Sequence, residues 1–108
     1  MHNDKWSKQE KTIARAAFDK AYEKECAQII EKIKKKSAKI SVPADIWDLH
    51  DYLYEIRKEI DQKYDYRYSV LILVFATLVK QQMLKIDDLK GLSADKIDKI
   101  KSLVNLKA

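Results

Sequence analysis

The sequence predicts an all-α protein: an elongated helical homodimer with long antiparallel helices as a stalk and a small helical head. One Gly and one Pro in 108 residues leave few turn formers. Apolar residues recur at spacings of three and four over long stretches, as on one face of a helix. The one strand-like segment has no second strand with which to pair. We expect a single domain over residues 1–108, with the stalk at about 7–64 and the head at about 69–106.

The first helix is expected to begin at Ser7, because Ser7 and Glu10 have the spacing of a capping box. No Gly or Pro interrupts the chain from there to about Ile40, so the helix has about 33 residues and is near 50 Å long. Its apolar positions are Ile13, Ala14, Ala17, Phe18, Ala21, Tyr22, Cys26, Ile29, Ile33 and Ile40. A chain of this size cannot bury both ends of such a rod, so we expect a second chain along this face.

Pro43 ends the first helix and suits the first turn of a second one, with Ser41 or Val42 near its cap. The second helix, from about Ala44 to Tyr64, carries two stripes roughly 100° apart. The apolar stripe consists of Ile46, Leu49, Leu53, Ile56, Ile60 and Tyr64. The polar stripe consists of Trp47, His50, Asp51, Tyr54, Arg57 and Asp61.

The remaining residues predict the head. Residues 64–68 lose the apolar period and are expected to form a connection. Residues 70–84 are long enough for a buried, nearly all-apolar helix. Residues 87–90 predict a single turn that Gly91 ends. Ser93 then caps a last helix. The side chains of that helix expected to face inward are Ile97, Ile100, Leu103 and Val104.

Composition indicates where such a protein works. The single cysteine, Cys26, cannot form an intramolecular disulfide and suits the reducing cytoplasm; we interpret it as a small core residue. Charged residues near the N-terminus argue against a signal peptide. The longest apolar stretch, residues 70–79, is far short of the roughly 18 residues that span a bilayer. We therefore expect a cytoplasmic protein without a membrane span.

The positive charge lies entirely in the first part of the chain. Residues 1–42 hold eleven Lys or Arg against six Asp or Glu, whereas residues 43–108 hold eleven of each. The lysine cluster consists of Lys32, Lys34, Lys35, Lys36 and Lys39. Such a cluster can attract nucleic acid. We favour a solvated helix face, because the chain has three arginines and no aromatic residues among these lysines to stack on bases.

The sequence offers no catalytic set. His50 and Asp51 are neighbours, and neighbouring helical residues point about 100° apart, so we expect no imidazole–carboxylate pair. With His2 as the other histidine, a His/Cys metal site cannot form within one protomer. One glycine is too few for a phosphate-binding loop. We expect a protein that is not an enzyme and has no cofactor or metal.

The polar stripe has two interpretations on these grounds. Its aromatic, imidazole and guanidinium groups are typical of protein-recognition surfaces. Alternatively, Arg57 and Asp61 form an ordinary surface ion pair, and Trp47 is a core residue beside a satisfied His50.

A specific pattern surrounds this stripe. Residues 47–51 read Trp-x-Leu-His-Asp, Arg57 follows, and residues 59–65 read Glu-Ile-Asp-x-Lys-Tyr-Asp. Further matching segments are Trp6-Ser7, Phe18-Asp19-Lys20-Ala21-Tyr22, Ser69-Val70, Val74-Phe75-Ala76, Leu78-Val79-Lys80, Ala94-Asp95-Lys96 and Lys99-Ile100-Lys101. Over nearly its whole length the chain resembles the fluorescence recovery protein family of cyanobacterial photoprotection. Leu73 stands where the cyanobacterial members carry phenylalanine.

The resemblance implies an all-helical homodimer without cofactor or chemistry of its own. Such proteins bind photoactivated orange carotenoid protein, chiefly its C-terminal domain, speed its return to the orange form and so end phycobilisome fluorescence quenching. The partner-binding positions implied are Trp47, His50, Asp51 and Arg57, with Lys99 in the head; Tyr54 lies in the same stripe. Ile46, Leu49 and Leu53 fall at the family's dimer interface, and Ile56 continues that face. Relatives also occur in bacteria without this carotenoid protein, so the alternative is a dimeric protein-binding module that uses the same surface on another partner.

Overall fold

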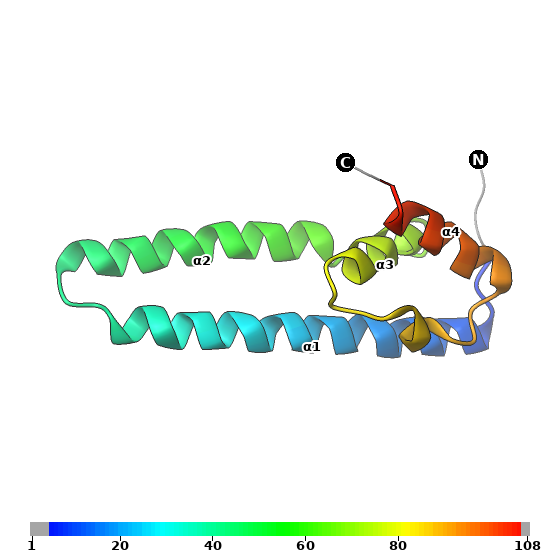
Figure 1. The fold of residues 1–108 in the computed structure, drawn as a ribbon, viewed down its shortest axis with the longest axis horizontal. Coiled ribbons are helices and arrows are strands. Elements are labelled where there is room, and N and C mark those ends of the chain that lie inside the picture. Colours follow the sequence, from blue (N-terminus) through cyan, green and yellow to red (C-terminus); the bar gives the residue numbers. More distant parts are fainter. Residues whose placement is uncertain (1–4, 107–108) are drawn as a thin grey trace.

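The computed structural model describes residues 5–106, which form an elongated helical molecule measuring 54 × 24 × 22 Å (Figure 1). Its elements are α1 (Lys8–Ala38), α2 (Pro43–Lys63), α3 (Leu71–Lys80), the short 3-10 helix η1 (Ile86–Leu89) and α4 (Ala94–Val104). The all-α prediction is confirmed. His2, the second histidine of the sequence, lies outside the described residues.

The helices α1 and α2 run antiparallel and form a hairpin whose turn is far from the other helices (Figure 1). The predicted capping box is present: the Glu10 N–H donates to Ser7 Oγ at 3.1 Å, and the Ser7 N–H donates to Glu10 Oε1 at 3.0 Å. At the turn, Asp45 Oδ2 accepts the N–H groups of Ser41 at 2.9 Å and Val42 at 3.2 Å. These bonds satisfy donors that a helix start otherwise leaves unpaired.

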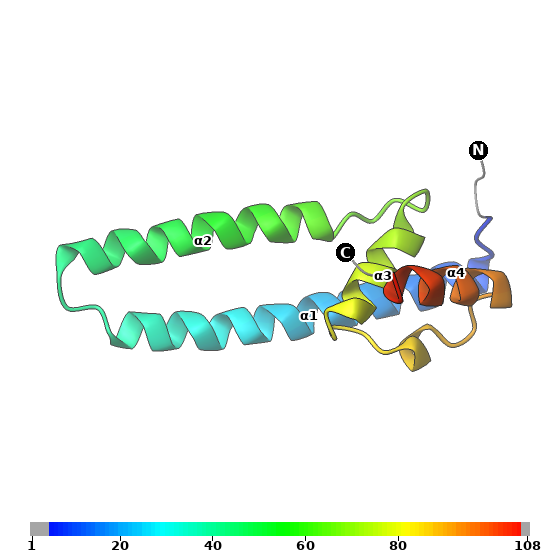
Figure 2. The ribbon, with the colours of Figure 1, turned by 45° about the horizontal axis from the view of Figure 1, so that its top comes forward.

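The hydrophobic core lies at the other end of the molecule. Its largest fully buried side chains are Phe75, Leu71, Leu78, Leu89 and Ile100. The first half of α1 takes part in this core with Ala14, Ala17, Phe18 and Ala21, and Trp6 packs there just before the helix. Figure 2 shows α3 and α4 against that half of α1. As the sequence predicted, Ile100 of α4 is buried and Ile97, Leu103 and Val104 pack against the core.

A buried ion pair joins the starts of α1 and α4. Lys96 Nζ lies 3.2 Å from Glu10 Oε1, and both side chains are almost fully buried. The same Lys96 Nζ donates to the Lys5 carbonyl at 2.5 Å and lies 4.9 Å from the centre of the Trp6 ring. Glu10 Oε2 also accepts the Ser93 N–H at 2.8 Å. Glu10 therefore caps α1 and anchors α4 at once.

The third helix is shorter than the sequence predicted. Apolar content suggested a helix through residue 84, but α3 ends at Lys80. Gln82 has a φ of 66°, in the left-handed region that residues other than glycine seldom adopt. Two contacts hold it there: Lys24 Nζ of α1 donates to the Gln82 carbonyl at 2.9 Å, and the Met83 N–H returns to the Leu78 carbonyl at 2.8 Å.

Gly91 follows η1, as the sequence predicted, and turns the chain into α4. Its φ is 108°, and a Cβ added there would collide with Cδ1 of Ile13. The positive φ is the reason that glycine is favoured here, whereas the contact is with the end of a flexible side chain, which can shift.

A polar cluster links the hairpin to α3. Glu25 Oε2 of α1 pairs with Lys63 Nζ of α2 at 2.6 Å, and Glu25 Oε1 accepts the Tyr64 O–H at 2.8 Å. Lys63 Nζ also donates to Gln81 Oε1 at 2.7 Å. Burial and then the bond to Glu25 raise the pKa of the Tyr64 hydroxyl. Across the described residues, none of the helices combines the length and apolarity that crossing a bilayer demands.

Candidate protein-docking face

The polar stripe is exposed along the whole of α2. Trp47 is 62% exposed and Tyr54 is 58% exposed, and His50, Asp51 and Arg57 also face solvent. Large aromatic side chains usually lose most of their exposure on folding. Trp47 is therefore not a core residue, and that part of the structural interpretation is wrong.

Neighbouring side chains within the stripe contact one another. His50 Nδ1 lies 3.2 Å from Asp51 Oδ1, so the expectation that these two groups do not pair is wrong. Rotation about χ1 and χ2 brings two exposed neighbours together even though their Cα–Cβ bonds diverge. The Trp47 and His50 rings meet edge to face, with centroids 6.3 Å apart. The stripe thus presents a connected aromatic and polar surface.

Arg57 is oriented by its own helix. Its Nε donates to both carboxylate oxygens of Asp61, each at 3.1 Å. The side chain of Arg57 nevertheless remains largely exposed, because Asp61 engages the inner nitrogen of the guanidinium. Its terminal nitrogens form no hydrogen bond with any residue between 5 and 106. A planar fork held in this way suits a carboxylate of another molecule.

The apolar stripe beside it is incompletely covered. Ile46 is 48% exposed, Leu53 is also exposed, and Leu49 and Ile56 are half-buried. Ile60 is the buried residue of α2, near the head. One described chain therefore leaves apolar surface open along most of α2.

Lys99 belongs to α4, and Trp47 belongs to the first turns of α2; Figure 1 shows α4 and the start of α2 at opposite ends of the molecule. Lys99 Nζ is 3.3 Å from Asp95 Oδ2, and Lys99 borders a shallow groove of about 400 Å³ with Ile72 and Leu103. Within one chain the structure does not bring Lys99 to the polar stripe.

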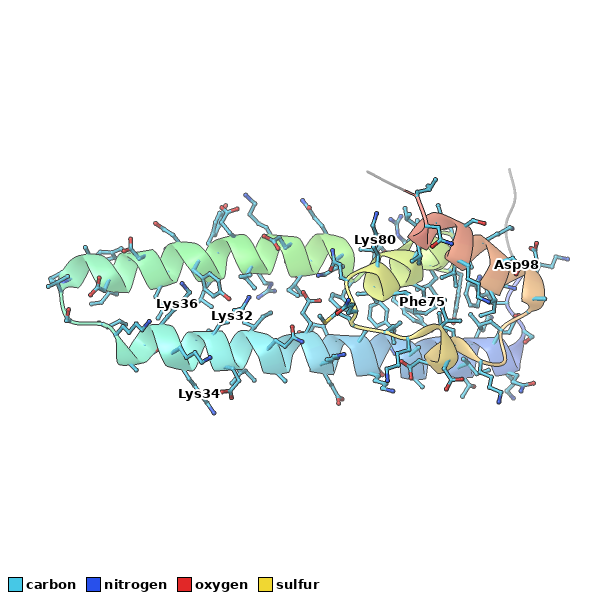
Figure 3. The ribbon with its side chains drawn as sticks, viewed as in Figure 1. Lys32, Lys34, Lys36, Phe75, Lys80 and Asp98 are labelled. Atoms are coloured by element: carbon cyan, nitrogen blue, oxygen red, sulfur yellow. The ribbon has the colours of Figure 1, made fainter. Side chains whose placement is uncertain are left out.

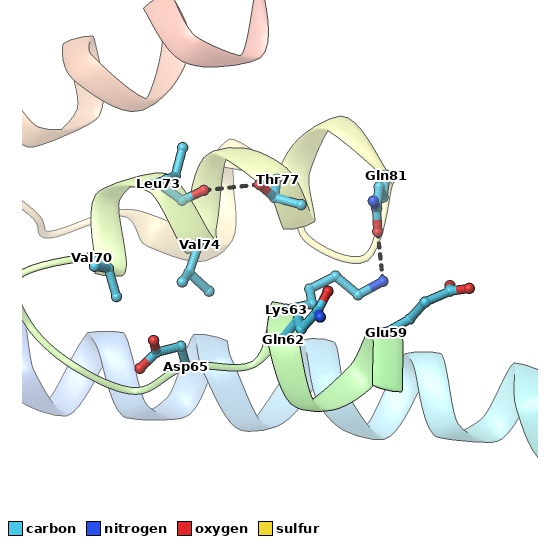
Figure 4. A pocket seen from close by; sticks show the side chains of 9 residues that line it. All are labelled: Glu59, Gln62, Lys63, Asp65, Val70, Leu73, Val74, Thr77 and Gln81. Carbon is cyan, nitrogen blue, oxygen red and sulfur yellow. Dashed lines mark hydrogen bonds between the residues drawn. The ribbon is translucent and has the colours of Figure 1, made fainter. Parts of the chain in front are cut away.

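Sequence reasoning missed a groove between the end of α2 and α3. It has a volume of about 440 Å³, and Figure 4 shows its lining residues, which include Leu73, Val74 and Thr77 of α3 and Glu59 and Lys63 of α2. Leu73 is 57% exposed, although the segment was interpreted as a buried helix. The helical period contained the signal, since Leu73 lies off the face that buries Leu71, Val74 and Leu78.

Cys26 is half-buried and is not a core residue, contrary to the sequence interpretation. It lines a groove of about 460 Å³ between α1 and α2, together with Tyr22, Leu53 and Arg57. A hydrogen bond with the Cys26 thiol raises the pKa of Tyr22. The core ends before this point, because no residue of α1 beyond Ala21 is buried.

The lysine cluster is spread over more than one face of α1. Lys32 and Lys36 lie on the side of α1 that faces α2, whereas Lys34 points away from it (Figure 3). Lys36 Nζ sits 4.6 Å from the centre of the Tyr52 ring, and Lys34 pairs with Glu31 at 3.7 Å. The dispersal favours a solvated helix over a phosphate-binding patch. In the described part of the chain, His, Cys, Asp and Glu form no group that could hold a metal ion.

The fold and this surface define an all-helical protein with an exposed aromatic and polar face. A profile of the family described as photoprotection regulator fluorescence recovery protein matches residues 6–104. The fluorescence recovery protein of Synechocystis sp. PCC 6803 is 43% identical over 101 residues, which cover 94% of this chain and 93% of that protein. The chain belongs to the fluorescence recovery protein family.

Solved structures of the family agree with the fold. The fluorescence recovery protein of Fremyella diplosiphon is 51% identical and superposes with a TM-score of 0.90. That of Synechocystis sp. PCC 6803 is 42% identical and gives the same TM-score. Each comparison covers 94% of this chain and 100% of the other.

Proposed function

We propose that this protein binds photoactivated orange carotenoid protein, chiefly its C-terminal domain, through the polar stripe of α2, with Lys99 as a further contact. Binding accelerates the return of the carotenoid protein to its orange form and so ends phycobilisome fluorescence quenching. The observation that carries this proposal is the exposure of Trp47, Tyr54 and Arg57 on one helix face that no described residue covers. We place the activity in the cytoplasm, where a lone thiol stays reduced.

The mechanism is differential binding. A protein without chemistry of its own accelerates a conformational reversion by binding the transition between two forms of its partner more tightly than it binds the starting form. A rigid surface suits this task, because its binding energy is not spent on ordering its own side chains. The Arg57–Asp61 and Trp47–His50 contacts supply that order in the free protein.

Replacing Arg57 by Ala is expected to weaken binding by about 2 kcal/mol, roughly 30-fold, as for an arginine at the centre of an interface. Arg57→Lys should recover only part of this loss, because a point charge does not replace a bidentate donor. The measurement is the rate of red-to-orange reversion against protein concentration. Arg67→Ala is the matched control, since Arg67 is also exposed and paired, with Asp65, but lies outside the stripe. If wild-type protein leaves the reversion rate unchanged at all concentrations, the alternative is favoured, in which the same surface binds another partner.

We infer further that two chains pair through the apolar stripe at Ile46, Leu49, Leu53 and Ile56. These side chains keep apolar surface that one described chain does not cover, and the second half of α1 lacks any buried residue. A surface of this kind on a long thin molecule is typical of a protein interface.

Ile46→Glu is expected to separate the dimer, because each interface would bury unpaired carboxylates. Sedimentation velocity measures the outcome directly. Ile30→Glu is the control, since Ile30 is similarly exposed but lies on α1 outside the predicted apolar positions. An intact dimer for Ile46→Glu, or separation by both variants alike, would refute this interface.

A further inference from the structure

A groove beside Arg57 extends the polar surface of α2 onto α1. It has a volume of about 630 Å³ and is lined on the α1 side by Arg15, Phe18, Asp19 and Tyr22. Arg57 and Asp61 form its α2 side. Arg57 thus belongs both to the polar stripe and to this groove. The groove could not be predicted from the sequence, because it forms only when the antiparallel hairpin brings α1 beside α2.

The floor of the groove is aromatic. The Phe18 and Tyr64 rings meet edge to face with centroids 5.4 Å apart, and the Tyr22 and Tyr64 rings do so at 5.2 Å. Tyr22 is 43% exposed, so part of this floor is open to solvent. Edge-to-face packing fixes the rings and leaves an apolar platform on which another side chain can lie.

The rim carries two arginine–aspartate pairs with the same spacing. Arg15 Nε lies 3.4 Å from Asp19 Oδ1, and Arg57 Nε bonds to both oxygens of Asp61. In each pair the aspartate engages Nε, the inner nitrogen of the guanidinium. Arg15 is also held by stacking, with its guanidinium carbon 4.4 Å from the centre of the Tyr66 ring. Both cations are therefore positioned before any partner arrives.

We propose that this groove receives a segment of the partner protein that carries a carboxylate next to an apolar side chain. The carboxylate bonds to the outer edges of the Arg15 and Arg57 guanidiniums, and the apolar side chain lies on the aromatic floor. The inference rests on the proposed function, because it makes α1 the second half of the same docking surface. Both guanidiniums line the groove, and a guanidinium fork binds a carboxylate in a bidentate manner. A polyanion suits the rim less well, since its further phosphates would meet Asp19 and Asp61.

The experiment measures the affinity of photoactivated orange carotenoid protein for wild type, Arg15→Met, Arg57→Met and the double variant. Methionine keeps an unbranched apolar side chain but removes the guanidinium and its stacking on Tyr66. We expect Arg15→Met to bind roughly tenfold more weakly, as for a lost hydrogen bond to a charged group. The double variant should lose less than the product of the two single losses, since both arginines hold one carboxylate. Arg67→Met, the matched control, should bind as wild type does.

Other results overturn the inference in distinguishable ways. Wild-type affinity for Arg15→Met beside weakened Arg57→Met would leave the proposed function standing and remove the groove from it. Absence of binding by wild-type protein would remove both. A changed sedimentation coefficient for Arg15→Met would show that the groove is an interface between copies of this chain. If circular dichroism shows that Arg15→Met is unfolded, Arg15→Lys decides: it keeps the charge but loses the fork, so wild-type affinity would overturn the proposal.

Discussion

Replacing Phe75 by Ala is expected to lower the free energy of unfolding by about 3–5 kcal/mol, the usual cost of deleting a buried phenyl ring. Phe75 is fully buried in the core that α1, α3 and α4 share. Its removal leaves a cavity among side chains from several elements, which cannot close by a local shift. Since small domains are stable by only about 5–15 kcal/mol, the loss is a large share of the total. Urea unfolding followed by far-UV circular dichroism measures it.

The control for this substitution lies in the same helix. Leu73→Ala removes an exposed side chain and is expected to change stability by less than about 1 kcal/mol. Equal losses for the two variants would mean that α3 is packed differently. A large loss of partner binding by Leu73→Ala, with stability intact, would add the groove of Figure 4 to the docking surface.

Glu10→Gln is expected to cost about 3 kcal/mol, because it leaves the Lys96 ammonium buried without its counter-ion. The glutamine amide has one acceptor oxygen and can keep only one of the bonds from the Ser7 and Ser93 N–H groups, so the loss includes an unpaired backbone donor as well as the charge. Thermal unfolding of the variant gives the measurement. Glu31→Gln is the matched control, since Glu31 pairs with Lys34 in solvent and such pairs contribute little. Similar losses for both variants would contradict the burial of the Glu10–Lys96 pair.

The same carboxylate gives a pH signature. The Ser7 N–H above all, and the Ser93 N–H and Lys96 besides, hold the pKa of Glu10 below its ordinary value of 4.5. A lowered pKa in the folded state means that the stabilisation is complete above pH 4.5 and is lost as the pH falls through the folded value. The melting temperature of wild type should therefore decline more steeply than that of Glu10→Gln in this acidic range. Parallel declines would contradict the assignment.

The sequence predicted those parts of the fold that depend on local chemistry. The helix start at Ser7, the turn at Pro43 and the cap at Ser93 follow from side-chain and backbone groups within four residues. The end of α3 did not follow, because the unusual φ of Gln82 is held by Lys24, which is distant in sequence. Apolar content alone made residues 81–84 resemble a continuing helix.

The candidate site likewise has features that the sequence predicted and features that it did not. Helical periodicity placed Trp47, Tyr54 and Arg57 on one stripe, and their exposure is now established. The pairing of His50 with Asp51 was missed because it depends on rotamers, which a helical period does not specify. The groove that joins Arg57 to Arg15 needs the packing of two helices whose contacts are remote in sequence.

The uninterrupted helix α1 fixes the distance between the two ends of the molecule. Its 31 residues contain neither Gly nor Pro, so the rod, about 46 Å long, has no built-in point at which to bend. One end is embedded in the core with Phe18 and Ala21, and the other carries the turn that leads to Trp47. Trp47 and Lys99 are consequently held at a set spacing. A partner that bound both residues would have to present two contact points at the same spacing.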